Sequence, residues 1–231
     1  MPFSVKTPDF LVENCLNDSK VWFTEHKEEY RKYITEPFAE VVNGLAETMH
    51  SIDSELVCDP KKLSRLYRDA RYAKGGPIFR DYVWYTFCRP KEDKYVQLGF
   101  YFSVSPDGFS YGCGFYNAGS SIMNEYRRLI LDGSKAFADA LKAYKAQKVF
   151  SLYGEMYKRS KFPDESPEKQ DWLNRKNAGI ACNSNDFALL FGSGLIPKLA
   201  EDFRSVAPIY KFFLAAEENS QRSLRNQTPK G

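Results

Sequence analysis

The chain has 231 residues, of which 43% are hydrophobic and 27% are charged, a composition typical of a folded globular protein with a hydrophobic core. Its formal net charge is only +3, and the acid-free segment 221–231 contains three basic residues, so the remaining chain is formally neutral. This balance argues against the broad basic surface of a dedicated nucleic-acid-binding protein and against a polybasic membrane anchor. We therefore expect neither nucleic acid nor a membrane among its partners.

The cysteines and histidines indicate the compartment and the absence of a metal site. Five cysteines are widely spaced and form no C-x-x-C pair, which is typical of reduced thiols in the cytoplasm. No signal-peptide pattern follows Met1, and no apolar segment approaches the roughly 20 residues that cross a bilayer. The two histidines, His26 and His50, have no ligand cluster around them. We predict a cytoplasmic protein without a metal or another cofactor.

The first third of the chain has helical periodicity. Thr7-Pro8-Asp9 is typical of a helix start, and this helix should end near Asn17. Asp18 or Ser19 can cap a second helix, which should be interrupted before Pro37. Beyond it a third, amphipathic helix is predicted by apolar residues at helical spacing: Phe38, Val41, Val42, Leu45 and Met49.

The middle of the chain changes to the period of two that is typical of strands. Tyr82–Phe87 and Tyr95–Ser105 are predicted strands, and in the second of them Tyr101 lies on the face opposite Phe100 and Phe102. The turn sequence Ser105-Pro106-Asp107-Gly108 leads into a third strand that ends at Phe115. The pattern predicts an antiparallel β-meander.

Helical periodicity returns after Gly119. Two helices are predicted over about 120–130 and 134–144, then a short helix over 168–175 and an edge strand over 179–182. A last helix should start near Pro197, and Pro208 should kink or split it. We predict an α+β fold, an antiparallel meander flanked by helices, in one domain over residues 1–218. Residues 219–231 should form a flexible basic tail.

Two glycines, in Gly112-Cys113-Gly114, admit two interpretations. With Gly119 before a serine-capped helix they resemble a phosphate-binding loop, but the spacing is not G-x-G-x-x-G. Both glycines fall on one face of a predicted strand, where they leave room for a close neighbour. The second interpretation is favoured.

The densest cluster of basic residues lies between the helical third and the meander. Within sixteen residues it holds four arginines, one lysine and an aspartate, namely Arg65, Arg68, Arg71, Arg80, Lys74 and Asp69. If Asp69 orients one guanidinium group, the other arginines can bind a carboxylate or a phosphate in bidentate fashion. Alternatively, the cluster is an Asp–Arg network that only stabilises the fold.

Several segments occur in the order of a known family: 17–27 with Tyr30, Arg65–Lys74, Gly99-Phe100-Tyr101-Phe102 with Pro106 and Gly108, and Tyr126-Arg127. In these the chain resembles the DUF2461 family of uncharacterised proteins. It departs from the family pattern at Ala73, where serine is usual, at Gly75-Gly76 and at Ile78-Phe79, and Arg80 can replace the charge of a missing lysine. The resemblance implies an α+β fold and no particular activity.

Three functions remain open. The first is a domain that binds a small anionic ligand between the aromatic sheet face and the arginine-rich segment, with aromatic walls and arginines drawn from Trp22, Trp84, Tyr101, Tyr116, Arg68, Arg71 and Arg127. The second is an enzyme for a phosphorylated or carboxylated metabolite, with His26 as general acid or base and Asp69 orienting an arginine. The third is a protein-interaction module that uses exposed tyrosines.

Overall fold

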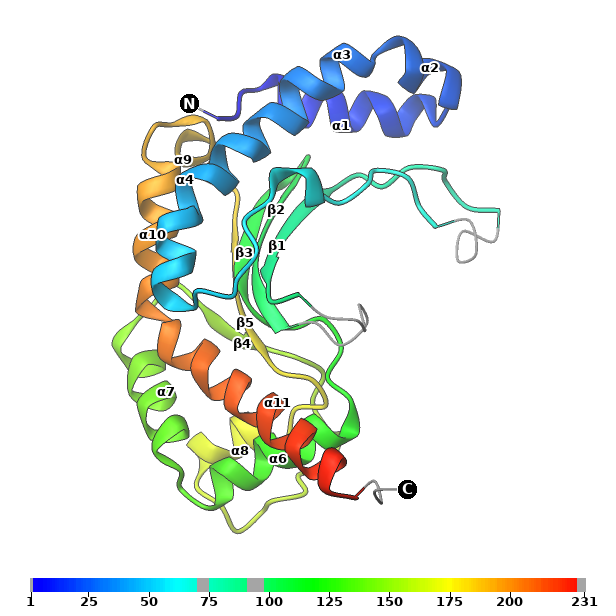
Figure 1. The fold of residues 1–231 in the computed structure, drawn as a ribbon. Coiled ribbons are helices and arrows are strands. Elements are labelled where there is room, and N and C mark those ends of the chain that lie inside the picture. Colours follow the sequence, from blue (N-terminus) through cyan, green and yellow to red (C-terminus); the bar gives the residue numbers. More distant parts are fainter. Residues whose placement is uncertain (1, 70–74, 91–97, 228–231) are drawn as a thin grey trace. The chain divides into compact units, whose positions relative to one another are not determined.

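The computed structural model describes residues 2–69, 75–90 and 98–227, with side chains to residue 223 (Figure 1). The predicted α+β class is confirmed: helices accompany one antiparallel five-stranded sheet with the strand order β1-β2-β3-β5-β4. Contacts between residues divide the chain into two compact units. The first comprises Met1–Phe87, Tyr101–Tyr111 and Asn183–Glu201, and the second comprises Cys88–Phe100, Gly112–Cys182 and Asp202–Gly231.

The helices of the first unit follow the predicted order with one change. The N-terminal elements are α1 (Lys6–Asn17), α2 (Lys20–Glu25), α3 (Lys27–Tyr30), the π-helical turn η1 (Arg31–Thr35) and α4 (Glu36–Ile52). The expected interruption before Pro37 is this π-helical turn. Because proline has no N–H and fits the first turn of a helix, the chain passes from η1 into α4 without a break.

Helix α4 supplies much of the core of the first unit. The five apolar residues that predicted it are each no more than 1% exposed. The ring of Phe38 lies 5.7 Å from that of Phe102 on the sheet, and Phe3 lies 5.3 Å from Phe38. Burial of such side chains contributes about 1.5–3 kcal/mol each. The predicted amphipathic helix is confirmed, and it covers one face of the sheet.

The meander is also confirmed. It consists of β1 (Val83–Cys88), β2 (Leu98–Ser105) and β3 (Gly108–Phe115); the predicted strand residues 95–97 lie outside the described residues. In β1 and β2 buried residues alternate with half-buried ones. The half-buried set, which we call the outer face of the sheet, includes Trp84 and Thr86 on β1 and Tyr101 and Ser103 on β2. This face lies opposite the one that Phe102 shares with α4.

The glycines of β3 allow a close approach between backbones. A Cβ atom on Gly112 would lie 2.0 Å from the carbonyl oxygen of Ile180 on β5 (Gly179–Ser184). Such a clash cannot be relieved by turning a side chain, because the obstacle is backbone. The space-making interpretation of these glycines therefore agrees with the structure.

The second unit is built around α11. Its elements are α6 (Ser120–Leu131), α7 (Lys135–Ala146), β4 (Ser151–Tyr153), α8 (Pro167–Leu173), most of β5, and α11 (Ala207–Gln227). Strand β4 pairs antiparallel with β5. Aromatic rings of four elements meet here, with Phe212 on α11 lying 5.1 Å from Tyr126, 5.4 Å from Phe137 and 6.0 Å from Trp172.

The C-terminal helices confirm one prediction and correct another. Helix α10 (Leu195–Ser205) ends just before α11, whose first turn holds Pro208, so the proline splits the predicted helix. The domain was expected to end near residue 218, but α11 continues to Gln227. Ser220 is buried, and Arg222 lies 3.9 Å from Glu218 one turn earlier. This ion pair joins consecutive turns of the helix past the last strongly apolar stretch.

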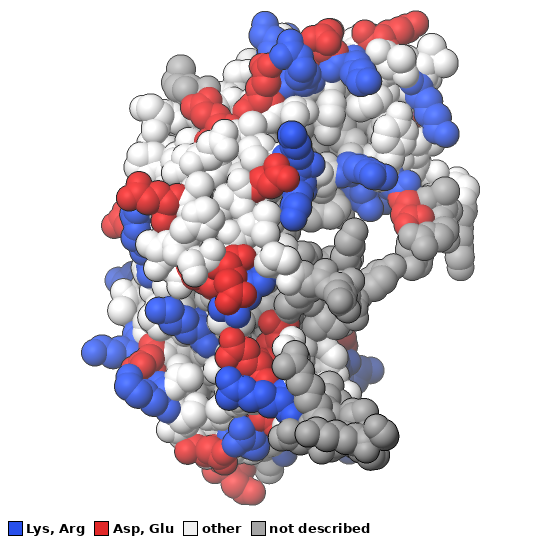
Figure 2. Space-filling view, viewed as in Figure 1, with Lys and Arg blue, Asp and Glu red and all other residues white. Residues whose placement is uncertain are grey.

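Two elements of the first unit were not predicted from the sequence. They are the 3-10 turn η2 (Pro60–Lys62) and the short helix α9 (Phe187–Phe191). Within the described residues, no helix is both long and apolar enough to span a membrane. Figure 2 shows acidic and basic side chains interspersed over the visible surface, in keeping with the nearly balanced composition.

Candidate functional site

The arginine-rich segment forms a two-stranded arm, which we define as residues 64–69 and 75–82. Tyr67 and Phe79 make an antiparallel bridge. The Arg68 amide donates to the Ile78 carbonyl and the Arg80 amide donates to the Leu66 carbonyl, each at 2.8 Å. Residues 70–74 lie outside the described residues. The arm therefore has a regular β-type base that fixes the direction of its side chains.

Aromatic packing holds the arm to the helices of the first unit. The Phe79 side chain is fully buried, and its ring lies 4.6 Å from that of Tyr67 and 5.3 Å from that of Phe23 on α2. The Phe23 ring also lies 5.2 Å from Tyr30 on α3. This cluster fastens the base of the arm against α2 and α3.

Asp18 supplies a second attachment of the arm. It occupies the left-handed region with φ 41° between α1 and α2. Its carboxylate accepts hydrogen bonds from the amides of Ile78, at 2.8 Å, and Phe79, at 3.1 Å. The sequence predicted only that Asp18 or Ser19 caps α2, and Ser19 performs that role by accepting from the Trp22 amide. Asp18 and Ile78 are 60 positions apart in the sequence, so no local sequence pattern predicts the hydrogen bond between them.

Arg80 is the most constrained arginine of the arm. Its Nη1 donates to the carbonyl oxygens of Arg65, at 2.9 Å, and Tyr67, at 2.8 Å, and its guanidinium carbon lies 5.2 Å from the centre of the Trp84 ring. Both protons of Nη1 are therefore used. The edge formed by Nε and Nη2 has no partner among the described residues, and this edge is the one that binds carboxylates and phosphates in bidentate fashion.

The other basic residues of the cluster are placed in part. Arg68 is exposed, and its Nε donates to the Phe79 carbonyl at 2.8 Å. Arg65 is exposed on the opposite side of the arm base, and Asp69 is half-buried. Arg71 and Lys74 lie outside the described residues. The base of the arm thus carries three cations, of which two are partly used to join its own strands.

The aromatic side of the site lies on the outer face of the sheet. The Trp84 ring lies 5.4 Å from the ring of Tyr82, which is 41% exposed. Tyr101 is on the same face of the adjacent strand, and Ser103 donates to the Val83 carbonyl at 3.1 Å. Of the predicted aromatic residues, Trp84 is thus brought directly to Arg80. The sequence carries no periodic signal for this pair, because the chain bends at Asp81 before β1 begins at Val83.

Trp22 on α2 and His26, the residue that follows this helix, form a pair of their own. Their rings are stacked at 4.0 Å with an angle of 13°, and the His26 Nδ1 lies 2.8 Å from the Trp22 carbonyl oxygen. A carbonyl only accepts, so the proton of the neutral ring is on Nδ1 and Nε2 is the free acceptor. These contacts explain the position of His26 by packing and hydrogen bonding, and they supply no catalytic partner.

Arg127 belongs to the second unit and binds backbone there. Its Nε donates to the Leu173 carbonyl at 3.1 Å, Nη1 to the Met123 carbonyl at 3.2 Å, and Nη2 to the Arg175 carbonyl at 2.8 Å. Nη2 also donates to Tyr157 Oη. The donors that the sequence analysis assigned to an anionic ligand are thus occupied by carbonyl oxygens of α6, of the end of α8 and of Arg175, and by the Tyr157 hydroxyl. The exposed Tyr116 also belongs to the second unit.

The pKa of the Cys15 thiol is shifted where α1 meets the arm. Burial raises the pKa of Cys15, the negative charges of Asp81 and Asp18 raise it further, and Arg68 acts in the opposite direction. The thiol is therefore protonated at neutral pH and is a poor nucleophile. In the described part of the chain, no three His, Cys, Asp or Glu side chains are grouped so as to hold a metal ion.

Fold and site together define an α+β protein in which a basic arm stands beside an aromatic sheet face. The family model of the conserved hypothetical proteins DUF2461 matches residues 6–212, so the chain belongs to that family. No curated protein and no solved structure matches the chain. The family carries no assigned reaction, and function must be argued from the side chains themselves.

Proposed function

We propose that the protein binds a small anionic ligand, bearing a phosphate or a carboxylate, at the base of the arm. The observation that carries this proposal is the geometry of Arg80. Two carbonyl oxygens and the Trp84 ring hold its guanidinium in place, and its bidentate edge has no partner among the described residues. An arginine that is already ordered loses little side-chain entropy when it binds an anion.

The surroundings of Arg80 favour an anion that carries an apolar or flat group. The exposed Arg68 adds positive charge on the same side of the arm, while Tyr82 and Trp84 offer a ring surface next to it. A ligand can place its charged end on the Arg80 edge and its body against these rings. A cytoplasmic location and reduced thiols belong to the same proposal.

The proposal is tested by isothermal titration with inorganic phosphate and phenyl phosphate at constant ionic strength. Phenyl phosphate should bind more tightly, because only it covers the aromatic rings. Trp84→Leu should remove this preference, and Arg80→Lys should weaken both ligands about tenfold, since a bidentate hydrogen bond to a charged group is lost.

A matched control separates this site from general surface charge. Lys27 is an exposed cation on α3, and Lys27→Gln should leave both affinities unchanged. Equal weakening by Lys27→Gln and Arg80→Lys, or no saturable binding by the parent protein, would reject the proposal. The melting temperature of each ligand-free variant shows whether the arm itself has been disturbed.

A further inference from the structure

The exposed face of α1 carries large apolar side chains. Among the described residues eight large apolar side chains are exposed, and four of these lie in the segment 5–21. Three of them, Val5, Val12 and Leu16, are 58%, 41% and 80% exposed and follow one another at the spacing i, i+7, i+11. Because an α-helix turns by about 100° per residue, this spacing places them on one side of the helix. We call these three residues the outer stripe of α1.

The outer stripe lies opposite the face by which α1 packs into the first unit. The buried residues of α1 are Thr7, Phe10, Leu11 and Asn14. At about 100° per residue, the mean direction of these four residues is about 180° from that of the outer stripe. A surface helix normally turns polar residues toward solvent and one apolar face toward the core. Helix α1 therefore has a second apolar face that its own unit does not use.

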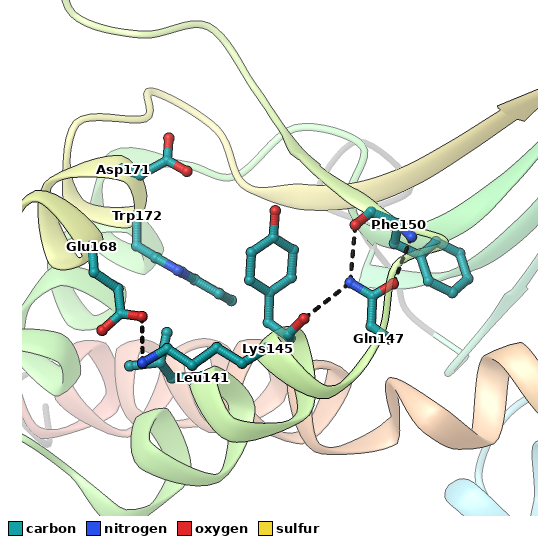
Figure 3. A pocket seen from close by; sticks show the side chains of 8 residues that line it. Leu141, Lys145, Gln147, Phe150, Glu168, Asp171 and Trp172 are labelled. Atoms are coloured by element: carbon teal, nitrogen blue, oxygen red, sulfur yellow. Dashed lines mark hydrogen bonds and ion pairs between the residues drawn. The ribbon is translucent and has the colours of Figure 1, made fainter.

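Helix α7, which has 12 residues like α1, shows the usual pattern. Its exposed positions hold only lysine, aspartate and alanine. Two of its lysines form ion pairs, Lys135 with Asp139 and Lys145 with Glu168 on α8, and the second pair lines a cavity of about 270 Å³ (Figure 3). Such a surface needs no partner. The outer stripe is therefore a particular feature of α1.

The charges beside the outer stripe differ between its two ends. Lys6 and Glu13 each follow a valine of the stripe by one position, so they lie on the same flank, and both are exposed. Lys6 Nζ lies 4.0 Å from Asp9, and Glu13 has no ion pair among the described residues. The flank is thus positive near the start of the helix and negative near its end. A second copy of α1 that runs antiparallel presents the opposite charge at each end.

We propose that two copies of this chain associate through the outer stripes of α1, packed antiparallel about a twofold axis. Val5 of one copy then lies against Leu16 of the other. In this heptad register Lys6 of each copy lies beside Glu13 of the other, and twofold symmetry makes every such contact occur twice.

The size of the stripe sets the strength of the association. A helix of 12 residues is about 18 Å long, so the interface is small and the dimer is weak. Asp9 lies at the edge of the stripe and faces Val12 of the second copy, which weakens the contact further. The interface shares no residue with the arm, so this proposal does not depend on the proposed anion site.

Sedimentation equilibrium of the full chain tests the association. Between about 5 and 500 μM, the average mass should rise from that of one chain toward that of two and no further, because a twofold pair is closed. Leu16→Lys should hold the mass at that of one chain. Leu131 on α6 is 42% exposed, so Leu131→Lys is the matched control and should behave like the parent protein. A constant mass of one chain for the parent protein, or equal loss of association in both variants, would overturn the proposal.

Charge reversal tests the antiparallel arrangement. Lys6→Glu and Glu13→Lys should each raise the dissociation constant about tenfold, because like charges then meet at two places in the dimer. The double variant restores opposite charges, so its dissociation constant should return to within about threefold of the parent value. All these side chains are exposed, and thermal unfolding of each variant checks that the fold is intact. A double variant that associates as weakly as the single variants would refute this arrangement.

Discussion

At the scale of single residues, Asn14 is the most unusual side chain of the molecule. It lies on the buried side of α1 with Phe10 and Leu11, it is 0% exposed, and neither amide atom has a hydrogen-bond partner in the described part of the chain. A buried polar group without a partner costs about 1–3 kcal/mol. The first unit therefore carries an energetic penalty inside its helical layer that an apolar residue would avoid.

Replacement of Asn14 by leucine should therefore stabilise the protein. We expect Asn14→Leu to raise the free energy of unfolding by about 1–2 kcal/mol, measured by urea denaturation, because it removes two unsatisfied atoms and keeps the branching and the number of heavy atoms of the side chain. Asn17 is exposed and donates to the Glu13 carbonyl, so Asn17→Leu is the control and should change stability little. A clear loss of stability in Asn14→Leu would instead reveal a water molecule or ligand atom on the amide.

Residues of the arm show why the site was only partly predictable. The cluster of basic side chains at Arg65, Arg68 and Arg80 is visible in the sequence, and so are the aromatic residues of the meander. The hydrogen bonds that these arginines make cannot be predicted from the sequence, because their described partners are backbone carbonyl groups, which every residue possesses. The role of Asp18 could not be predicted for a second reason, because its hydrogen-bond partner Ile78 lies 60 positions away in the sequence.

At the scale of elements, the arm depends on the connection between α1 and α2. Asp18→Ala removes three hydrogen bonds from the Ile78 and Phe79 amides to the carboxylate and places a residue other than Asn, Asp or Gly at positive φ. We expect a loss of about 1–3 kcal/mol and faster hydrogen exchange of the Ile78 and Phe79 amides.

A conservative variant separates the effect of the lost hydrogen bonds from the effect of the positive φ. Asp18→Asn tolerates the left-handed conformation and keeps one acceptor oxygen, so it should lie between the parent protein and Asp18→Ala in stability. Exchange rates at Ile78 and Phe79 that stay unchanged in Asp18→Ala would show that aromatic packing alone holds the arm.

Elements differ in how well the sequence predicts them, and length explains the difference. Helix α4 and the meander have long apolar patterns with one clear period, and the structure confirms them. Strand β4 has three residues and α9 has five, too few for a period to appear. The extension of α11 to Gln227 rests on polar contacts within the helix, which a search for apolar residues overlooks.

At the scale of the whole molecule, burial raises the pKa values of several cysteine and tyrosine side chains. Burial raises the pKa of the Cys113 thiol on β3 well above its ordinary value, and burial also raises the pKa of Tyr126 on α6. Burial has the same effect on Cys58 and Tyr30. In each case the folded state holds its proton at a pH where the unfolded chain releases it.

Because these pKa values are higher in the folded state than in the unfolded state, the protein should lose stability at alkaline pH. A folded-state pKa above the unfolded value contributes stability that is complete below the unfolded pKa, about 8.5 for cysteine and about 10 for tyrosine, and is lost as pH rises further. The free energy of unfolding should therefore fall steadily above about pH 9. Cys113→Val, which replaces the thiol by an apolar side chain, should make this fall shallower without changing its onset for the tyrosines.

The measurement is a series of urea unfolding curves at increasing pH. Identical slopes for the parent protein and Cys113→Val would show that this thiol does not contribute to the linkage.

Several long-range hydrogen bonds in both units join a side chain to the backbone, and this has an evolutionary consequence. Asp18, Arg68, Arg80 and Arg127 each reach across the chain to backbone atoms. Substitution of the residue that owns such a backbone atom leaves the atom in place, so no paired change is required to keep the bond. In related sequences these four positions should each be constrained singly, and statistical covariation should overlook the contacts that they make.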